Sequence, residues 1–169
     1  KIRKDPQYLP SGGYEVFKGW QDTSAKLDPA SIDWSAAGRG HFPYRLRQRP
    51  GKQNALGQVK FMFPNRFDVY LHDTPARNLF HRPVRTFSSG CIRLEKPLAL
   101  AEALLAADGQ APDRIPSILE SGETTRLNLA KPVPVHLAYL TAWIGEGGTV
   151  EFRDDVYGRD ALLANALGL

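Results

Sequence analysis

The most informative part of this sequence is a pair of segments separated by a long loop, Tyr70-Leu71-His72-Asp73-Thr74-Pro75 and Ser88-Ser89-Gly90-Cys91-Ile92-Arg93-Leu94. We expect a β-strand over residues 67–72, because the turn chemistry of Asp73-Thr74-Pro75 stops a strand ladder. His72 is therefore expected at the C-terminal end of that strand. Residues 73–88 show no sustained periodicity, and a loop of this length in a compact domain is more often functional than filler.

Turn signals on either side of this region mark the other elements. A helix is predicted over residues 97–107, since Pro97 suits a first helical position and Asp108-Gly109 follows. A helical start is expected over 5–9, a turn or single helical turn over 27–32, and helices over 114–120 and 159–167. Further strands are expected over 14–17, 44–49, 58–63, 125–129, 133–143 and 149–153, the last two joined across 145–148. This order predicts an α+β domain that is mostly β with a few helices.

Length and composition indicate a single folded domain over residues 1–169. Hydrophobic residues make up 42% and charged residues 24% of the chain, which argues against disorder and against a coiled coil. The 15 glycines and 13 prolines favour short elements joined by many turns. The first residues begin abruptly before a strand, so we expect the chain to be truncated at its N-terminus.

The charge balance is mildly basic, with 22 Lys and Arg against 18 Asp and Glu and a pI near 9.3. That excess suits an anionic partner, but neither a nucleic-acid-binding motif nor a basic stripe is present, so no nucleic acid is expected. No apolar run is long enough to cross a bilayer. The single cysteine, Cys91, excludes an internal disulfide and a multi-thiolate zinc site.

Cys91 has the surroundings that a nucleophilic cysteine needs. His72 could be fixed by donating its Nδ1–H to a neighbouring backbone carbonyl, which leaves Nε2 free to take the thiol proton. Gly90 lets the backbone approach a substrate carbonyl, so the N–H groups of Gly90 and Cys91 could form an oxyanion hole. Taken singly, however, a lone cysteine is more often a packing residue and a lone histidine a structural one.

Metal and cofactor chemistry finds no support in the sequence. The four histidines, His41, His72, His81 and His136, show neither H-x-x-H nor H-E-x-x-H spacing. We therefore expect no metal and no cofactor, and a structural role for His81 and His136.

His72, followed after a loop by Ser89-Gly90-Cys91-Ile92-Arg93, resembles the catalytic signature of the YkuD-type L,D-transpeptidase domain. The pattern from Tyr70 to Cys91 is most similar to the YcbB-like branch of Gram-negative bacteria. Further segments that look like that branch are 54–61, 139–143 and 152–155, so the resemblance extends over the whole chain. It implies a β-sandwich-like catalytic domain whose active site is covered by a long lid loop, here residues 73–88.

The resemblance also implies roles for individual residues. Cys91 would be the nucleophile, His72 the general base and then acid, and the backbone carbonyl of Asp73 the group that orients His72. Many YkuD-type domains have a histidine before the glycine, whereas this chain has Ser89, so His72 must be the sole base. The implied oxyanion-hole residue is Gly90. The implied substrate-binding residues are Tyr70, Arg93, Ser88 and Ser89.

The family's reaction is peptidoglycan cross-linking. The thiolate attacks the carbonyl between meso-diaminopimelate and the terminal D-alanine of a donor tetrapeptide stem, D-alanine leaves, and an acceptor amine resolves the thioester to a 3→3 cross-link. Carbapenems acylate the same thiol. Arginines near the site, Arg77, Arg82, Arg85 and Arg93, would attract the carboxylates of the stems. The resemblance places the protein in the periplasm, with the export signal or anchor upstream of this chain.

Several alternatives stay open at this point. Water in place of the acceptor amine would make a carboxypeptidase, and the amine of an outer-membrane protein would make an anchoring enzyme. Outside enzymology, the domain could be a peptidoglycan-binding module or an anion-binding β domain unrelated to the cell wall. The presence of both His72 and Cys91 argues against a silent binding module, which needs neither.

Overall fold

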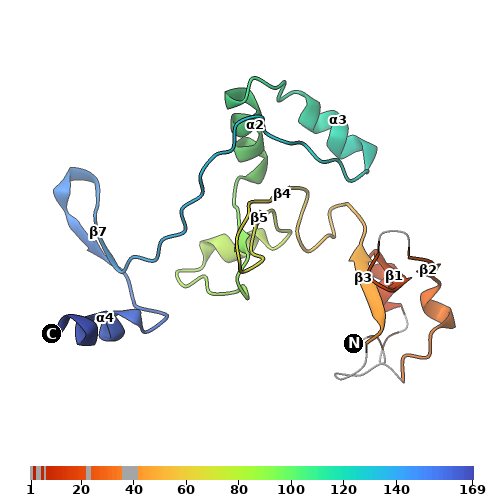
Figure 1. The fold of residues 1–169 in the computed structure, drawn as a ribbon, viewed down its shortest axis with the longest axis horizontal. Helices are drawn as coiled ribbons and strands as arrows, with labels where there is room; N and C mark the ends of the chain where they lie inside the picture. Colours follow the sequence, from red (N-terminus) through yellow and green to blue (C-terminus); the bar gives the residue numbers. More distant parts are fainter. Residues whose placement is uncertain (1, 3–4, 6, 22–23, 36–41) are drawn as a thin grey trace. The chain divides into compact units, whose positions relative to one another are not determined.

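The computed structural model describes residues 2, 5, 7–21, 24–35 and 42–169, and its elements are drawn in Figure 1. Backbone contacts divide the chain into two compact units, Lys1–Lys131 and Pro132–Leu169. Eight strands form three small sheets, and four α-helices accompany them among the described residues. The predicted α+β class is therefore confirmed.

The first sheet of the larger unit has the order β2-β1-β3 and is antiparallel throughout. Its strands are β1 (Tyr14–Lys18), β2 (Lys26–Leu27) and β3 (Tyr44–Gln48), and the short helix α1 (Tyr8–Ser11) precedes it. Val16 and Phe17 in β1 are buried, as is Leu9 in α1. The 3₁₀ turn η1 (Pro29–Ser31) begins as predicted, with the Asp28 carboxylate accepting from Ala30 N–H at 3.0 Å.

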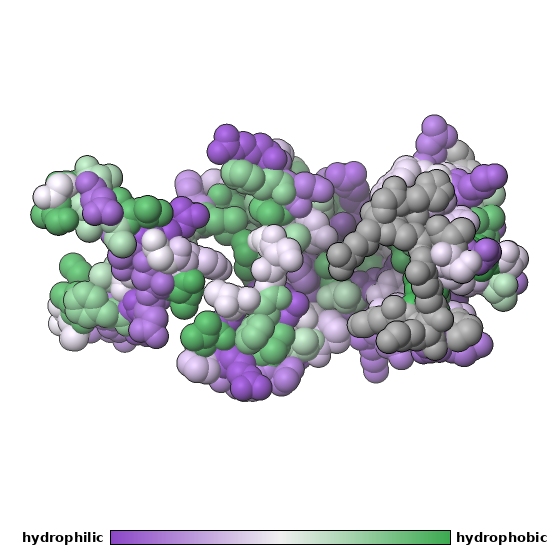
Figure 2. Space-filling model, turned by 90° about the horizontal axis from the view of Figure 1, so that it is seen from below, coloured by the Kyte–Doolittle hydropathy of each residue, from purple (hydrophilic) through white to green (hydrophobic). Residues whose placement is uncertain are grey.

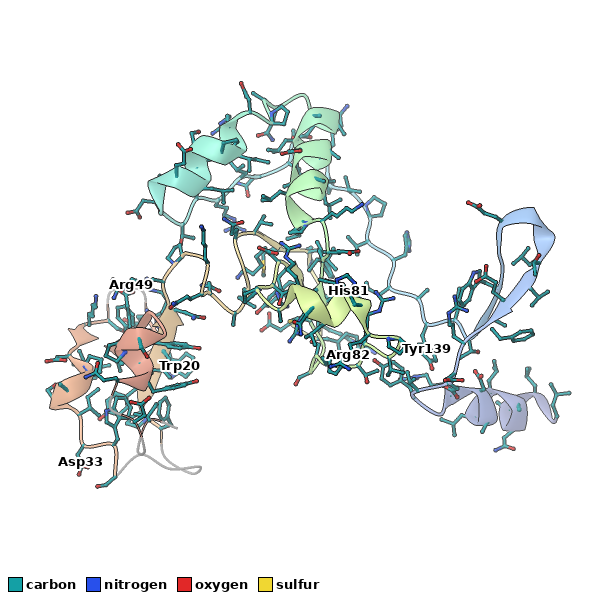
Figure 3. All side chains as sticks on the ribbon, turned by 180° about the vertical axis from the view of Figure 1, so that it is seen from behind. Trp20, Asp33, Arg49, His81, Arg82 and Tyr139 are labelled. Carbon is teal, nitrogen blue, oxygen red and sulfur yellow. The ribbon has the colours of Figure 1, made fainter. Side chains whose placement is uncertain are left out.

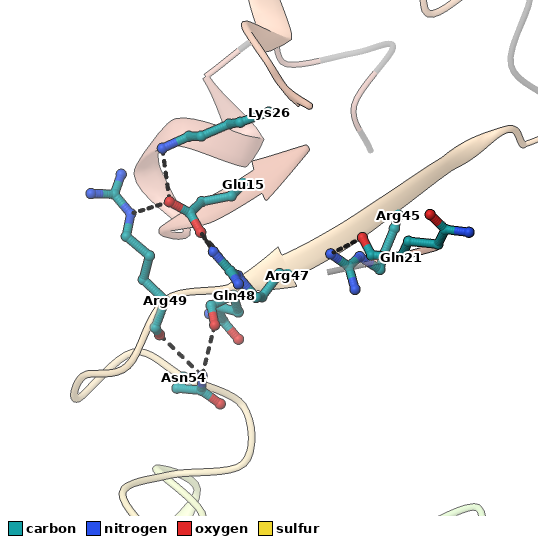
Figure 4. Close-up of polar contacts among 8 residues, drawn as sticks. All are labelled: Glu15, Gln21, Lys26, Arg45, Arg47, Gln48, Arg49 and Asn54. Carbon is teal, nitrogen blue, oxygen red and sulfur yellow. Dashed lines mark hydrogen bonds and ion pairs between the residues drawn. The ribbon is translucent and has the colours of Figure 1, made fainter. Parts of the chain in front are cut away.

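Glu15 in β1 is buried, with 9% of its surface exposed, and three cations surround its carboxylate (Figure 4). Lys26 Nζ and Arg47 Nη2 each lie 2.8 Å from it, and Arg49 Nε lies at 4.0 Å. The Lys26 hydrogen bond, followed by that of Arg47, holds the pKa of Glu15 below its ordinary value of 4.5. The cluster therefore joins the three strands through one ionised carboxylate.

Glu15→Gln is expected to lower the free energy of unfolding at pH 7 by about 1.5–3 kcal/mol, the range for hydrogen bonds to charged groups. Because the pKa is depressed in the folded state, this stabilisation is present above the ordinary pKa and is lost as the pH falls through the folded one. Urea unfolding at pH 7 and at pH 3 checks this. Glu102→Gln, which changes an exposed glutamate, serves as the control. If the free energy of unfolding of Glu15→Gln differed from that of the wild type by the same amount at pH 7 and at pH 3, the stabilising role of the ionised Glu15 carboxylate would be contradicted.

The second sheet has the order β4-β5-β6, with strands β4 (Lys60–Phe61), β5 (Leu71–His72) and β6 (Ile92–Arg93). The strands predicted over 58–63 and 67–72 are thus wrong in length. An Asn65 turn takes the residues between them, because its side-chain oxygen accepts from Phe67 and Val69 N–H while its amide donates to the Val69 carbonyl. Even so, β5 ends at His72, as predicted.

Two helices follow β6 where the sequence predicts them. Helix α2 (Pro97–Ala107) begins with Pro97, and α3 (Arg114–Ser121) ends at Gly122, whose φ of 67° is in the left-handed region that glycine favours. Their buried residues are Pro97, Leu105 and Ile115.

The strand predicted over 125–129 and most of the one predicted over 133–143 are wrong. This segment finds no neighbouring strand among the described residues, and its prolines, Pro132 and Pro134, cannot donate to a ladder. It is held instead to the end of α2, where the Asp108 carboxylate accepts from Ala130 N–H at 2.7 Å and from Lys131 N–H at 2.9 Å. These bonds, that of Ala130 first, lower the pKa of Asp108.

The smaller unit consists of the hairpin β7 (Ala142–Ile144) and β8 (Val150–Phe152), joined through the 3₁₀ turn η3 (Glu146–Gly148), and of helix α4 (Arg159–Leu167). The Tyr139 hydroxyl donates to Asp155 at 2.6 Å and lowers the pKa of that carboxyl to about 2. Apolar side chains of this unit, among them Ile144, Phe152 and Leu163, are exposed, and the unit shows green patches in Figure 2. In the described residues, no helix has the length and apolarity to span a membrane.

Candidate active site

The second sheet brings the segments around His72 and Cys91 together. β5 and β6 pair in parallel with Leu71 opposite Ile92 and His72 opposite Arg93, and Ile92 N–H donates to the Tyr70 carbonyl at 3.0 Å. Tyr70 and Cys91 immediately precede the paired residues of the two strands. Because side chains alternate along extended chain, we expect Tyr70, His72, Cys91 and Arg93 to lie on one face if this register continues by one residue.

His72 is 5% exposed and its imidazole is oriented by the backbone. Nδ1 bonds to the carbonyl of Asp73, which is the contact predicted from the sequence. A carbonyl oxygen only accepts, so Nδ1 must carry the proton and neutral His72 has its lone pair on Nε2. The Tyr70 ring meets this imidazole edge-on, with ring centroids 5.9 Å apart. The arrangement thus presents a proton acceptor at a fixed orientation.

Tyr70 links the histidine to the cysteine. Its pKa is raised by burial first, and then by its proximity to the Cys91 side chain. The Lys60 ammonium lies 5.0 Å from the centre of the Tyr70 ring, and Lys60 is the antiparallel partner of His72. Lys60 was not predicted from the sequence, because only the β4–β5 register places it beside these residues.

The turn before Cys91 is organised by Ser88. Its hydroxyl donates to the Cys91 carbonyl at 2.5 Å and accepts from Gly90 N–H at 3.2 Å. Gly90 has a φ of 147°, and a Cβ there would lie 3.1 Å from Val69, so this position favours glycine. Cys91 is half-buried, whereas Ser88 and Ser89 are exposed. The predicted oxyanion donor Gly90 N–H therefore already has an internal partner.

Asp73 provides more than the carbonyl that bonds to His72. Its carboxylate is buried and accepts from Gln58 N–H at 2.8 Å and from Arg77 Nη2 at 2.6 Å. Gly57 packs so closely against this carboxylate that a Cβ would collide with it. Arg77, expected from the sequence to attract substrate, forms an ion pair that was not predicted, although the (i, i+4) spacing of Asp73 and Arg77 was visible.

The loop of residues 73–88 is attached at both ends. Near its start, Arg77 in the 3₁₀ helix η2 (Arg77–His81) also donates to the Glu95 carbonyl, and at its end the Phe87 carbonyl accepts from Arg93 Nη2 at 3.4 Å. His81 and Arg82, at the end of η2, are exposed; Figure 3 labels both side chains. Residues 81–90 are all exposed, and Arg85 is among them.

No group of three or more His, Cys, Asp or Glu side chains that could hold a metal occurs among the described residues. His41 lies outside those residues, while His81 and His136 are exposed. The chemistry available at this face is therefore that of a thiol, an imidazole and backbone N–H groups, flanked by the cations of Lys60 and Arg93.

Comparisons with known proteins identify the family of this chain. The family model of the YkuD L,D-transpeptidase catalytic domain matches residues 1–135, which include both strands of the face and the loop between them. The chain therefore belongs to the YkuD family of L,D-transpeptidase catalytic domains.

A curated relative from Haemophilus influenzae (strain Rd), provisionally described as an L,D-transpeptidase, is 42% identical over 160 residues. That alignment covers 95% of this chain and 32% of the relative. The chain thus spans about a third of the length of the relative that it matches.

Proposed function

We propose that this domain is a cysteine-dependent acyltransferase that forms 3→3 cross-links in peptidoglycan. One observation carries the proposal: within the region matched by the family, His72 has its Nδ1 bonded to a carbonyl, and its strand pairs in parallel with the strand that follows Cys91. A thiol with a fixed imidazole beside it is the arrangement that covalent acyl transfer requires.

Acylation begins with His72 Nε2 taking the proton of the Cys91 thiol. The thiolate attacks the carbonyl carbon between meso-diaminopimelate and D-alanine of the donor stem. The C–N bond then breaks, His72 gives its proton to the departing amine, and a thioester and free D-alanine result. In the second half-reaction the acceptor amine attacks the thioester, His72 takes its proton, and the proton returns to the Cys91 sulfur as the new amide leaves.

The tetrahedral intermediates carry a negative oxygen, which the backbone N–H groups of Gly90 and Cys91 stabilise in this proposal. Gly90 N–H bonds to the Ser88 hydroxyl at 3.2 Å, so its use requires that the hydroxyl give way. Ser88 would thus shape the turn, and Ser89 would contact the substrate from its exposed position beside Gly90.

Substrate binding follows from the charges and the aromatic ring around Cys91. Arg93 would meet a carboxylate of a stem peptide with its two-pronged guanidinium, and Lys60 adds a second cation on the same face. Tyr70 would line the cleft. Residues 73–88 would act as the lid over the bound stem, with exposed arginines on their surface, Arg82 and Arg85.

The same thioester permits other acceptors. Water would give D-alanine without cross-links, and the amine of an outer-membrane protein would give a protein-linked stem. Carbapenems would acylate Cys91 in place of the donor. This reaction requires no cofactor, and because its substrate is the cell wall, we propose that the domain acts in the periplasm.

Mass spectrometry of products tests this function. With disaccharide tetrapeptides as the only substrate, the chain is expected to release D-alanine and form a dimer joined through two diaminopimelate residues. Fragmentation of the dimer distinguishes a 3→3 from a 4→3 bond. D-Alanine release with tripeptide as the only other product would indicate the carboxypeptidase, and the absence of any product from a folded chain would contradict the proposal.

A further inference from the structure

We propose that the Asp73–Arg77 ion pair is a positioning device that sets the orientation and tautomer of the His72 imidazole. The inference rests on the proposed function only in taking His72 as the base. The Arg77 side chain makes no contact with the reacting atoms in the proposed mechanism. Its role here is to position His72 and not to attract substrate.

One residue, Asp73, combines two tasks. Its backbone carbonyl accepts the Nδ1–H of His72, while its carboxylate, 3.0 Å or less from each partner, is held by Gln58 N–H and the Arg77 guanidinium. The whole residue is 3% exposed. Gly57 has no room for a Cβ against the carboxylate, so the side chain is enclosed on that side as well.

The Asp73 carbonyl that accepts from His72 can still move by rotation about one backbone bond. Asp73 N–H donates to the Val59 carbonyl at 2.9 Å, which fixes the peptide group before the residue. Rotation about the following Cα–C bond would still swing the carbonyl away from Nδ1. The ion pair closes the chain from Asp73 to Arg77 into a turn, in which Ala76 N–H also bonds to the Thr74 hydroxyl at 3.2 Å. That closure restrains the rotation.

Arg77 suits this position because it reaches two acceptors at once. Nη2 donates to Asp73 and Nη1 donates to the Glu95 carbonyl, which follows β6. The guanidinium therefore connects the residue after His72 to the strand that leads on from Cys91. A lysine ammonium supplies the charge but lacks the rigid fork, so it is expected to replace only part of this contact.

Imidazole ¹⁵N NMR of the full chain tests the proposal directly, because the shifts of the two ring nitrogens report which one carries the proton. The His72 signals are assigned by their loss in His72→Gln. In the wild type they are expected to show protonated Nδ1. Arg77→Met is expected to shift them toward a mixture of tautomers, with Arg77→Lys in between and Arg114→Met, an exposed arginine of α3, like the wild type.

Alkylation of Cys91 by iodoacetamide gives the second readout. Misplacement of a catalytic group by about 1 Å can cost about 100-fold in rate, so Arg77→Met is expected to slow alkylation by 10–100-fold, with partial recovery in Arg77→Lys. If Arg77→Met fails to fold, Asp73→Asn keeps the shape and removes the charge, and the same shift is expected.

A folded Arg77→Met or Asp73→Asn chain with the wild-type His72 signals and alkylation rate would overturn the positioning role. This outcome would leave the proposed function untouched. Conversely, a chain without transferase products but with the expected tautomer change would refute the function and retain the positioning pair.

Discussion

Cys91→Ala is expected to abolish acyl-enzyme formation and D-alanine release from tetrapeptide stems. Without the thiol no thioester can form, and removal of the nucleophile lowers kcat by about 10⁶-fold in a well-studied covalent hydrolase. Cys91 is half-buried and alanine is smaller, so the fold is expected to survive. The measurement is D-alanine release over hours at high enzyme concentration, together with the circular dichroism spectrum.

Cys91→Ser provides the matched control. It keeps a polar atom at the same position but replaces the thiol by a far weaker nucleophile, so it is expected to fold as the wild type and to release D-alanine at no measurable rate. Release by either variant at the wild-type rate would mean that another group attacks the donor carbonyl.

The second large effect is expected for His72→Gln, with a fall of 10²–10⁴ in the acylation rate, the range typical of general acid–base groups. Glutamine retains an N–H that can reach the Asp73 carbonyl, so the surrounding hydrogen bond is kept while the proton acceptor is lost. Stopped-flow acylation by a carbapenem measures this rate, since the reaction consumes the chromophore of the inhibitor.

His81→Gln is the control for that variant, because His81 is an exposed histidine of the same loop. It is expected to be acylated at the wild-type rate. Equal losses in His72→Gln and His81→Gln would show that the loop as a whole, rather than the imidazole of His72, determines the rate.

The parts of the fold set by local chemistry were predictable. Pro97 and Asp108-Gly109 delimit α2, Gly122 ends α3, and the glycine-rich stretch 145–148 joins β7 to β8. Each of these signals acts within a few residues, so no knowledge of neighbouring elements is needed.

Features that depend on distant residues were not predictable in the same way. Residues 125–129 were predicted as a strand but pair with no strand in the described part of the chain, and the Ala130 and Lys131 N–H groups that follow them bond to Asp108. The Asn65 turn shortens β5, although the Phe63-Pro64-Asn65 sequence was a visible turn signal. A run of strand formers therefore predicts extended backbone more reliably than it predicts a paired strand.

The candidate site shows the same division. The resemblance implied that the Asp73 carbonyl orients His72, and Nδ1 of His72 bonds to that carbonyl. The pairing of His72 with Cys91 in catalysis stays a prediction. Lys60 reaches His72 through antiparallel pairing across the Asn65 turn, and Arg77 reaches Asp73 through the course of the loop. The Lys60 contact arises from tertiary structure, for which a single sequence holds no periodic signal, whereas the (i, i+4) spacing of Asp73 and Arg77 was visible.

The central claim is that Cys91 attacks an acyl donor, and intact-protein mass spectrometry after incubation with a carbapenem tests it most directly. The account predicts that the chain gains the mass of one inhibitor molecule and that proteolytic mapping places it on the peptide containing Cys91, with no gain in Cys91→Ala. An unmodified wild-type chain, or an adduct of the same mass that persists in Cys91→Ala, would contradict it.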